Sequence, residues 1–148
     1  MAARAVEAEN RRLLRARDAM DRDFSLPLDL PHLAAIALVS EAHFSRTFRA
    51  AFGETPHRYL QRRRVERAMY LLRTTSRSIT DICMEVGFTS LGTFSRTFRD
   101  IVGEAPSAFR ERGAMPNVPS CFVKAWVRPV GARASSFGEA PSRGSVVP

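Results

Sequence analysis

An eighteen-residue segment occurs twice in this chain, and this repeat constrains the fold more than any other feature. Residues 43–60 read HFSRTFRAAFGETPHRYL, and residues 93–110 read TFSRTFRDIVGEAPSAFR, with nine of the eighteen aligned positions identical. A repeat with only two copies is not a solenoid, which needs at least about three units. The sequence therefore predicts two copies of one small supersecondary unit.

Each copy of the repeat predicts an amphipathic helix. Phe44 and Phe48 lie four residues apart and share one helix face, and the second copy has the same pair fifty residues later. At about 100° per residue, Arg46 and Arg49 point to the opposite side of the helix. A helix with aromatic residues on one side and arginines on the other can dock on a small core and insert its far side into a nucleic-acid groove.

The charge of the chain favours a polyanionic partner. Its 148 residues carry 23 basic and 15 acidic side chains, which gives a net charge of +8. Lys124 is the single lysine, and the planar fork of arginine suits guanine edges and phosphates. Nine arginines and three acids fall within residues 40–77, so +6 of the net charge lies there. A GC-rich genome would also explain the ratio of arginine to lysine, but it would not explain the net charge.

Capping residues and stop signals divide the chain into short helices. In the first half, Asp29, Ser40 and Thr55 are good N-caps and Gly53 is a good stop, which predicts helices over about 7–23, 30–37, 40–52 and 56–74. The signals then recur, with a turn at Gly87 and helices over about 78–86, 90–102 and 106–112. Along the helix 56–74, the predicted buried stripe is Val65, Ala68, Met69 and Leu72, and the arginines predicted to lie off that stripe are Arg58, Arg62, Arg63 and Arg67.

A short helix, a tight turn and a second helix make a helix-turn-helix, and this pattern occurs twice. The helix 56–74 lies between the two units, and nineteen residues at 1.5 Å each span about 28 Å. Two recognition helices held that far apart could enter successive major-groove segments, which repeat every ~34 Å. The alternative is a plain helical bundle with solvated arginines, but a bundle has no need to repeat two arginines in register.

The chain resembles the DNA-binding domain of the AraC/XylS family of bacterial transcription regulators. The resemblance covers about residues 10–112 and is most specific over SITDICMEVGFTSLGTFSRTFRDIVGEAPSAFR; LPLDLPHLA and TPHRYLQRRRVERAMYLLR match as well. It implies an all-α fold of about seven helices, arranged as two helix-turn-helix subdomains joined by a long linker helix. It also implies sequence-specific binding to promoter DNA.

The resemblance implies DNA contacts on both recognition helices, 40–52 and 90–102. The expected base contacts are Ala42, Ser45, Arg46, Leu91, Gly92, Thr93 and Arg96. Arg46 and Arg96 are the candidates for bidentate contact with guanine O6 and N7, although a phosphate or salt-bridge role stays open for each. The expected backbone contacts are Ser40, Arg49, Arg62, Arg63, Ser90, Ser95 and Arg99.

One position departs from the family's pattern. The first turn reads IALVS, with Leu38 where the family usually has glycine. A leucine held at positive φ costs of order 1 kcal/mol. We therefore expect the first unit to have a distorted turn or a weaker grip on DNA.

Residue types and spacing argue against other chemistry. His32, His43 and His57 lack metal-ligand spacing, and Cys83 and Cys121 make neither a disulfide framework nor a metal site. No nucleophile–base pair, carboxylate pair or phosphate-binding loop stands out, so we expect no enzymatic activity, no cofactor and no metal. No apolar run approaches the roughly 18 residues of a membrane span, and the first residues lack the apolar h-region of a signal peptide. The expected location is the bacterial cytoplasm, at the nucleoid.

Composition changes after Gly113. We expect residues 1–113 to form the DNA-binding domain and residues 114–148, with five prolines and five serines, to form a mostly flexible tail. Within it, CFVKAWV at 121–127 could dock on the domain or bind a partner. The expected assembly is a monomer without a fused sensor domain on double-stranded promoter DNA, with RNA polymerase as a further partner. The alternatives are a helical adaptor for polymerase or another regulator, and a non-specific DNA-binding protein.

Overall fold

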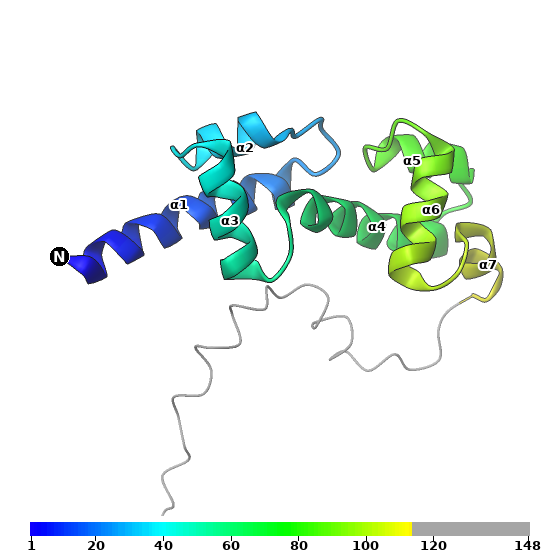
Figure 1. Cartoon of the computed structure of the whole chain (residues 1–148). Helices are drawn as coiled ribbons and strands as arrows, with labels where there is room; N and C mark the ends of the chain where they lie inside the picture. Colours follow the sequence, from blue (N-terminus) through cyan, green and yellow to red (C-terminus); the bar gives the residue numbers. More distant parts are fainter. Residues whose placement is uncertain (114–148) are drawn as a thin grey trace, which may run out of the picture.

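Seven helices and no strand make up residues 1–113, which are the residues that the computed structural model describes (Figure 1). The helices are α1 (Ala2–Arg22), α2 (Leu30–Ile36), α3 (Glu41–Phe52), α4 (Pro56–Thr74), α5 (Ile79–Glu85), α6 (Leu91–Val102) and α7 (Pro106–Glu111). The first lobe contains α1–α3, the second contains α5–α7, and α4 joins them (Figure 1). The predicted all-α fold is confirmed. The predicted tail, 114–148, lies outside the described residues.

Side-chain caps set the starts of α2, α3, α4, α5 and α6, as the sequence predicts. The hydroxyl of Ser40 accepts a hydrogen bond from the backbone N–H of His43, and Thr55 and Ser78 cap α4 and α5 in the same way. Gly53 ends α3 at φ +78°, in the left-handed region that glycine enters without a steric penalty. Because these signals are local, the predicted bounds of α4, 56–74, agree with the structure.

Each lobe closes around the same aromatic arrangement. In the first lobe, Phe48 meets Tyr59 of α4 edge to face, with ring centroids 5.6 Å apart. In the second lobe, Phe98 meets Phe109 of α7 in the same way at 5.5 Å. All four rings are buried. The last helix, α7, therefore covers its lobe as the start of α4 covers the first, which confirms two copies of one unit.

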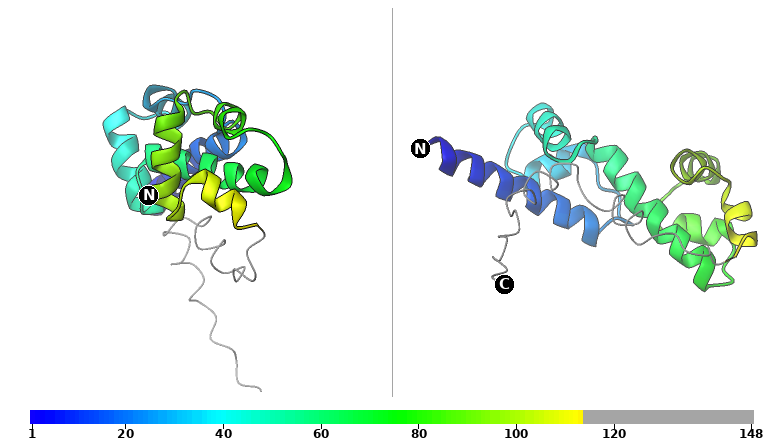
Figure 2. Two further views of the ribbon diagram at one scale, coloured as in Figure 1. Left: turned by 90° about the vertical axis from the view of Figure 1, so that its right-hand side faces the viewer. Right: turned by 90° about the horizontal axis from the view of Figure 1, so that it is seen from below.

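The first helix, α1, is longer than predicted. It begins at Ala2 rather than near residue 7, and it runs past the first lobe on the side away from the second (Figures 1 and 2). Leu13, Ala16 and Met20 are buried. Leu14 is 39% exposed, because a residue next to Leu13 lies about 100° around the helix.

The linker helix α4 contributes to both cores. Tyr59 and Leu60 pack in the first lobe, whereas Val65, Ala68 and Leu72 pack in the second. Met69, predicted with them, is partly buried against the second core. The prediction that Arg62 lies outside the buried surface is wrong, since this residue is only 9% exposed.

The turn between α2 and α3 keeps its regular form despite Leu38. This residue adopts φ +58°, while Gly87 adopts φ +99° at the matching place in the second lobe. In both turns the residue at positive φ donates to the carbonyl three positions back and the next residue donates five positions back, each at 3.1 Å. The expected distortion of the first turn is therefore not found, and the strain falls on the leucine itself.

Replacing Leu38 with glycine should stabilise the domain. Its side chain is 67% exposed, so little apolar burial is lost, and relief of the left-handed strain should raise the free energy of unfolding by about 0.5–1 kcal/mol. Chemical denaturation would measure this change. Gly103→Leu is the matched control, because it puts leucine at φ +93° in open space and should lower stability. Unchanged or lower stability of Leu38→Gly would contradict the strain argument.

Candidate nucleic-acid interface

The recognition helices α3 and α6 occupy equivalent positions in the two lobes. Each follows a short helix and a tight turn, and both run in the same general direction in Figure 1, one on either lobe. Phe44 of α3 and Phe94 of α6 turn into their cores and are fully buried. The opposite side of each helix is consequently left to solvent, where a groove could receive it.

The residues predicted to contact bases lie at the surface at the start of these helices. Ser45 is half-buried, and the others are exposed: Ala42, Arg46, Leu91, Gly92, Thr93 and Arg96. Apart from the two arginines these side chains are small or apolar. A Cβ built on Gly92 would meet only the Ser90 hydroxyl, at 3.7 Å, within 4 Å. This end of each helix can therefore approach a flat surface closely.

The predicted backbone contacts on the recognition helices are also accessible. Ser40 and Ser90 are exposed N-caps whose oxygens accept the N–H of His43 and Thr93, at 3.3 and 3.2 Å, so each hydroxyl proton is still able to donate. Arg49 and Arg99 are exposed in the last turn of α3 and α6, and Ser95 is half-buried. These groups surround the residues predicted to contact bases.

Four arginines on the recognition helices carry charge that the domain does not neutralise. Within residues 1–113, no hydrogen bond or ion pair engages the guanidinium groups of Arg46, Arg49, Arg96 and Arg99. An arginine that folding leaves without a carboxylate keeps its five donors for a ligand. Phosphate oxygens and guanine edges are the groups that such donors match in two-pronged geometry.

The sequence-based role of Arg62 is corrected by its surroundings. Its Nε and Nη2 donate to Glu54 Oε1 at 3.0 and 2.5 Å, its Nη1 donates to Glu66 Oε1 at 2.9 Å, and the guanidinium carbon lies 5.1 Å from the centre of the Tyr59 ring. The side chain is only 11% exposed. The guanidinium is thus held by two carboxylates, which leaves it unsuited to the predicted phosphate contact.

Arg63 belongs to the same internal network. Its Nε lies 3.0 Å from Asp21 Oδ1 in α1, and its Nη1 donates to Glu66 Oε2 at 2.7 Å. Asp21 also accepts the hydroxyl of Tyr59 at 2.8 Å. Burial raises the pKa of Glu66, while hydrogen bonds from Arg63 and Arg62 oppose that rise. The network ties α1 to α4 and gives Arg63 a structural role, while its phosphate contact stays a prediction.

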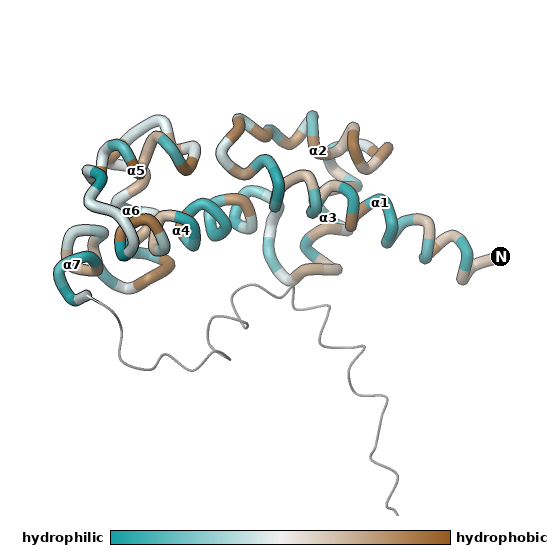
Figure 3. Tube along the Cα trace, turned by 180° about the vertical axis from the view of Figure 1, so that it is seen from behind, coloured by the Kyte–Doolittle hydropathy of each residue, from teal (hydrophilic) through white to brown (hydrophobic). Residues whose placement is uncertain are grey.

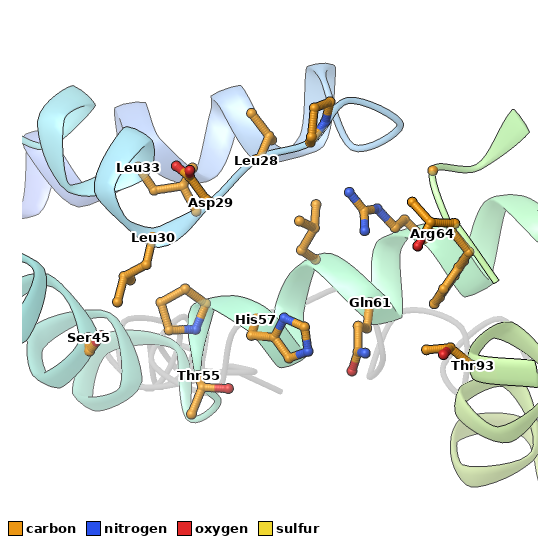
Figure 4. Close-up of a pocket in the computed structure, with 16 residues that line it drawn as sticks. Leu28, Asp29, Leu30, Leu33, Ser45, Thr55, His57, Gln61, Arg64 and Thr93 are labelled. Atoms are coloured by element: carbon orange, nitrogen blue, oxygen red, sulfur yellow. The ribbon is translucent and has the colours of Figure 1, made fainter. Parts of the chain in front are cut away.

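A cleft between the two lobes was not predicted. It has a volume of about 610 Å³ and is lined by Ser45 of α3 and Thr93 of α6, with α4 between them (Figure 4). His57 and Gln61 project from α4 into this space (Figure 4). Their spacing of four residues, which places them on one face of α4, is the sequence signal that could have indicated them.

A contact with α1 holds the start of the first recognition helix. His43 Nε2 lies 2.6 Å from Glu9 Oε1. Both side chains are about two-fifths exposed. The long first helix therefore buttresses α3 close to Ala42 and Arg46, the residues predicted to contact bases.

Two helix-turn-helix units on one chain, each with unpaired arginines on its recognition helix, define a DNA-binding protein of the double helix-turn-helix class. A family model described as a helix-turn-helix domain matches residues 33–112, more than half of the chain. The chain belongs to the AraC family of transcription regulators. Its family is one of regulators and not of enzymes.

Relatives of known class support this assignment. Regulatory protein SoxS of Salmonella typhimurium is 37% identical over 74 residues, which cover 50% of this chain and 69% of SoxS. The transcriptional activator RhaR of Cronobacter sakazakii is 34% identical over 82 residues, 55% of this chain but only 28% of RhaR. An uncharacterized regulator of Haemophilus influenzae is 36% identical over 61 residues, 41% of this chain and 20% of its own length.

Solved structures agree with the fold. An AraC-type regulator from Chromobacterium violaceum superimposes with a TM-score of 0.67 at 31% identity, covering 73% of this chain and 96% of that one. The DNA-binding domain of the global transcriptional factor AdpA, solved with a target DNA, gives a TM-score of 0.63 at 31% identity, covering 68% of this chain and 90% of its own. The arrangement of two lobes on a linker helix is thus shared with a domain that binds DNA.

Residues 1–113 offer no metal-binding cluster and no membrane-spanning helix. Within this part of the chain, no group of three or more His, Cys, Asp or Glu side chains is placed to hold a metal ion. Hydrophilic and hydrophobic residues alternate along the helices (Figure 3), and none of the described helices has the length and apolar character needed to cross a membrane.

Proposed function

We propose that the chain binds promoter DNA sequence-specifically by inserting α3 and α6 into successive major-groove segments on one face of the duplex. The observation that supports this most is the set of unpaired arginines at matching positions of the two recognition helices, Arg46, Arg49, Arg96 and Arg99. The nineteen residues of α4 span about 28 Å, close to the ~34 Å groove repeat. The related AdpA domain, solved in complex with a target DNA, supports DNA binding by this fold.

Base reading is assigned to the first two turns of each helix. Arg46 and Arg96 reach guanine O6 and N7 in this proposal, since a bidentate guanidinium contact is specific for that edge. Leu91 and Thr93 present methyl groups to thymine. Gly92 adds no side chain between α6 and the bases, and Ala42 and Ser45 play this part in α3.

Phosphate contact is assigned to the periphery of these groups. Arg49 and Arg99, one turn further along, and the hydroxyls of Ser40, Ser90 and Ser95 meet the backbone on either side of each groove. We add His57 and Gln61 as phosphate contacts, because they face the cleft between the two lobes. The DNA backbone between the two major-groove segments would pass this cleft. Arg62 is no longer included, and the phosphate contact of Arg63 stays a prediction.

A monomer suffices for this mode of binding, because both recognition helices belong to one chain. RNA polymerase as a second partner, and a site of action at the nucleoid in the cytoplasm, stay predictions of the same proposal. The absence of catalysis stays a prediction as well. Neither the polymerase contact, nor the location, nor the absence of catalysis is needed for the proposed binding of DNA by α3 and α6.

Selection from random DNA tests the proposed function. The full chain and residues 1–113 should select the same site, protect a footprint of about two helical turns and remain monomeric on it, because each chain fills two groove segments. Titration against the selected site and against random DNA gives the specificity ratio, expected at about 10³ or more. A ratio near one would indicate a non-specific binder or an adaptor, and binding only as a dimer would contradict the monomer.

A further inference from the structure

The linker helix α4 is not the sole connection between the lobes. Arg64, near its middle, donates from Nε to the carbonyl oxygen of Phe24 at 2.6 Å and from Nη2 to that of Leu26 at 2.8 Å. Both carbonyls belong to the loop between α1 and α2, in the first lobe. The guanidinium therefore fastens this loop to the helix at the point where α4 passes from one core to the other.

The same loop touches the second lobe. A Cβ built on Gly87, in the turn between α5 and α6, would lie 2.8 Å from the carbonyl oxygen of Ser25 and 3.0 Å from Arg64 Nε. The Arg64 guanidinium carbon also lies 5.9 Å from the centre of the Phe88 ring. Phe24 packs against the cores of both lobes. The turn that precedes α6 is thus pressed against the first lobe, with glycine as the residue that fits.

The surroundings of Arg64 differ from those of an ordinary surface arginine. The residue is partly buried, and burial lowers the pKa of its guanidinium. Within residues 1–113 its hydrogen-bond partners are backbone carbonyls and no carboxylate. The Arg64 side chain therefore holds the loop in place through the carbonyls of Phe24 and Leu26. Its loss would leave the Phe24 carbonyl without a hydrogen-bond donor.

We propose that Arg64 and Gly87 are positioning residues that fix the two lobes relative to each other and thereby set the half-site spacing that the protein accepts. This inference rests on the proposed function. Gly87 lies four residues before Leu91, where α6 starts, so a shift of this turn carries the second recognition helix with it. A rigid pair of helices matches one groove spacing, whereas a loosened pair tolerates several.

The variants that test this are Arg64→Met and Gly87→Ala. Methionine keeps an apolar stem but loses both hydrogen bonds to the loop, and alanine places a methyl group against Ser25. Arg67→Met is the control for the first, on an exposed position of the same helix. Gly103→Ala is the control for the second, because Gly103 has φ +93° but no neighbour within 4 Å of a Cβ.

The first measurement needs no DNA. Nitroxide labels on cysteines introduced at Ala50 and Asp100, exposed residues of α3 and α6, report the distance between the lobes by electron spin resonance, in a background with Cys83→Ala and Cys121→Ser. We expect one narrow distance distribution for the parent chain and both controls, and a broadened or displaced one for Arg64→Met and Gly87→Ala. Unchanged distributions in both variants would overturn the proposal, whether or not the chain binds DNA specifically.

The second measurement uses the selected site with one or two base pairs inserted or removed between its half-sites. The parent chain should lose at least about tenfold in affinity at each altered spacing, since one helix forfeits its base contacts. The two variants should bind the original site more weakly and distinguish the spacings by less than about threefold. If Arg64→Met fails to fold, the test rests on Gly87→Ala. A Gly87→Ala variant that keeps the spacing preference of the parent chain would overturn the proposal.

Discussion

Replacing Arg96 with alanine is expected to weaken binding to the selected site by about 1–3 kcal/mol and to relax base preference at one position. Arg96 is exposed on α6, and within residues 1–113 no carboxylate holds it, so the substitution should leave the fold intact. A bidentate contact with guanine would account for both effects, because its loss removes affinity and discrimination together. Titration and repeated site selection with the variant measure them.

Arg99→Ala provides the matched control on the same helix. Arg99 lies about one turn further along and is assigned to phosphate, so its removal should weaken all sequences alike and reduce the salt slope by about one unit. If Arg96→Ala instead weakens selected and random DNA equally, its assignment to bases fails and a phosphate contact replaces it.

Much of the fold could be predicted because its signals are local. The start of α4 follows from Thr55, which caps the helix by accepting the N–H of a residue three positions away, and from the proline that follows. Gly53 and Gly103 adopt the left-handed conformation that ends α3 and α6. The repeat predicted the remaining part of the fold, because two similar sequences of this length adopt the same unit. The two lobes share even the edge-to-face aromatic pair.

The role of Arg62 could not be predicted, because it depends on partners that periodicity does not show. A helical wheel places this residue off the apolar stripe of α4, beside other arginines that remain accessible. Glu54, eight residues earlier, folds back from the turn before α4, and Tyr59 supplies a ring beneath the guanidinium. A run of arginines can thus contain both residues paired inside the domain and residues open to solvent, and the sequence alone does not distinguish the two.

The connection between the lobes was missed for a similar reason. Arg64 and the carbonyl of Phe24 are forty residues apart, and no pattern in either segment indicates the other. Gly87 was predicted as a turn glycine, which is correct, but its close approach to Ser25 is a second reason for glycine there. The recognition helices could be predicted because the residues that start, end and pattern each helix lie within or next to it. Their relative placement depends instead on contacts between residues distant in sequence.

The largest expected change in stability follows from Arg62. Arg62→Ala should lower the free energy of unfolding by about 3 kcal/mol or more, since removing one partner of a buried ion pair leaves the other charge unpaired. Here the groups left behind are Glu54 and Glu66, whose side chains are 22% and 16% exposed. Thermal unfolding should show Tm lower by more than about 10 °C.

The loss of stability caused by Arg62→Ala should depend on pH, and the direction of this dependence follows from Glu66. Burial raises the pKa of this carboxyl, and the hydrogen bond from Arg62 is among the interactions that oppose the rise, so the pKa should be higher still in the variant. A carboxyl whose folded pKa lies above its unfolded value favours folding at low pH, and this contribution is lost as pH rises through the folded pKa. The Tm deficit of Arg62→Ala should therefore shrink between neutral pH and about pH 5.

Arg67→Ala is the matched control, because Arg67 is an exposed arginine of the same helix that stacks on Tyr70, with its guanidinium carbon 4.9 Å from the ring centre. It should change the free energy of unfolding by less than about 0.5 kcal/mol, as surface substitutions usually do. A folded Arg62→Ala with parental Tm, but with weaker binding to all DNA and a shallower salt dependence, would restore the phosphate contact that the sequence suggested. Loss of stability with a pH-dependent deficit would instead show that the domain uses this arginine to join α4 to the turn at Glu54, leaving the reading of DNA to α3 and α6.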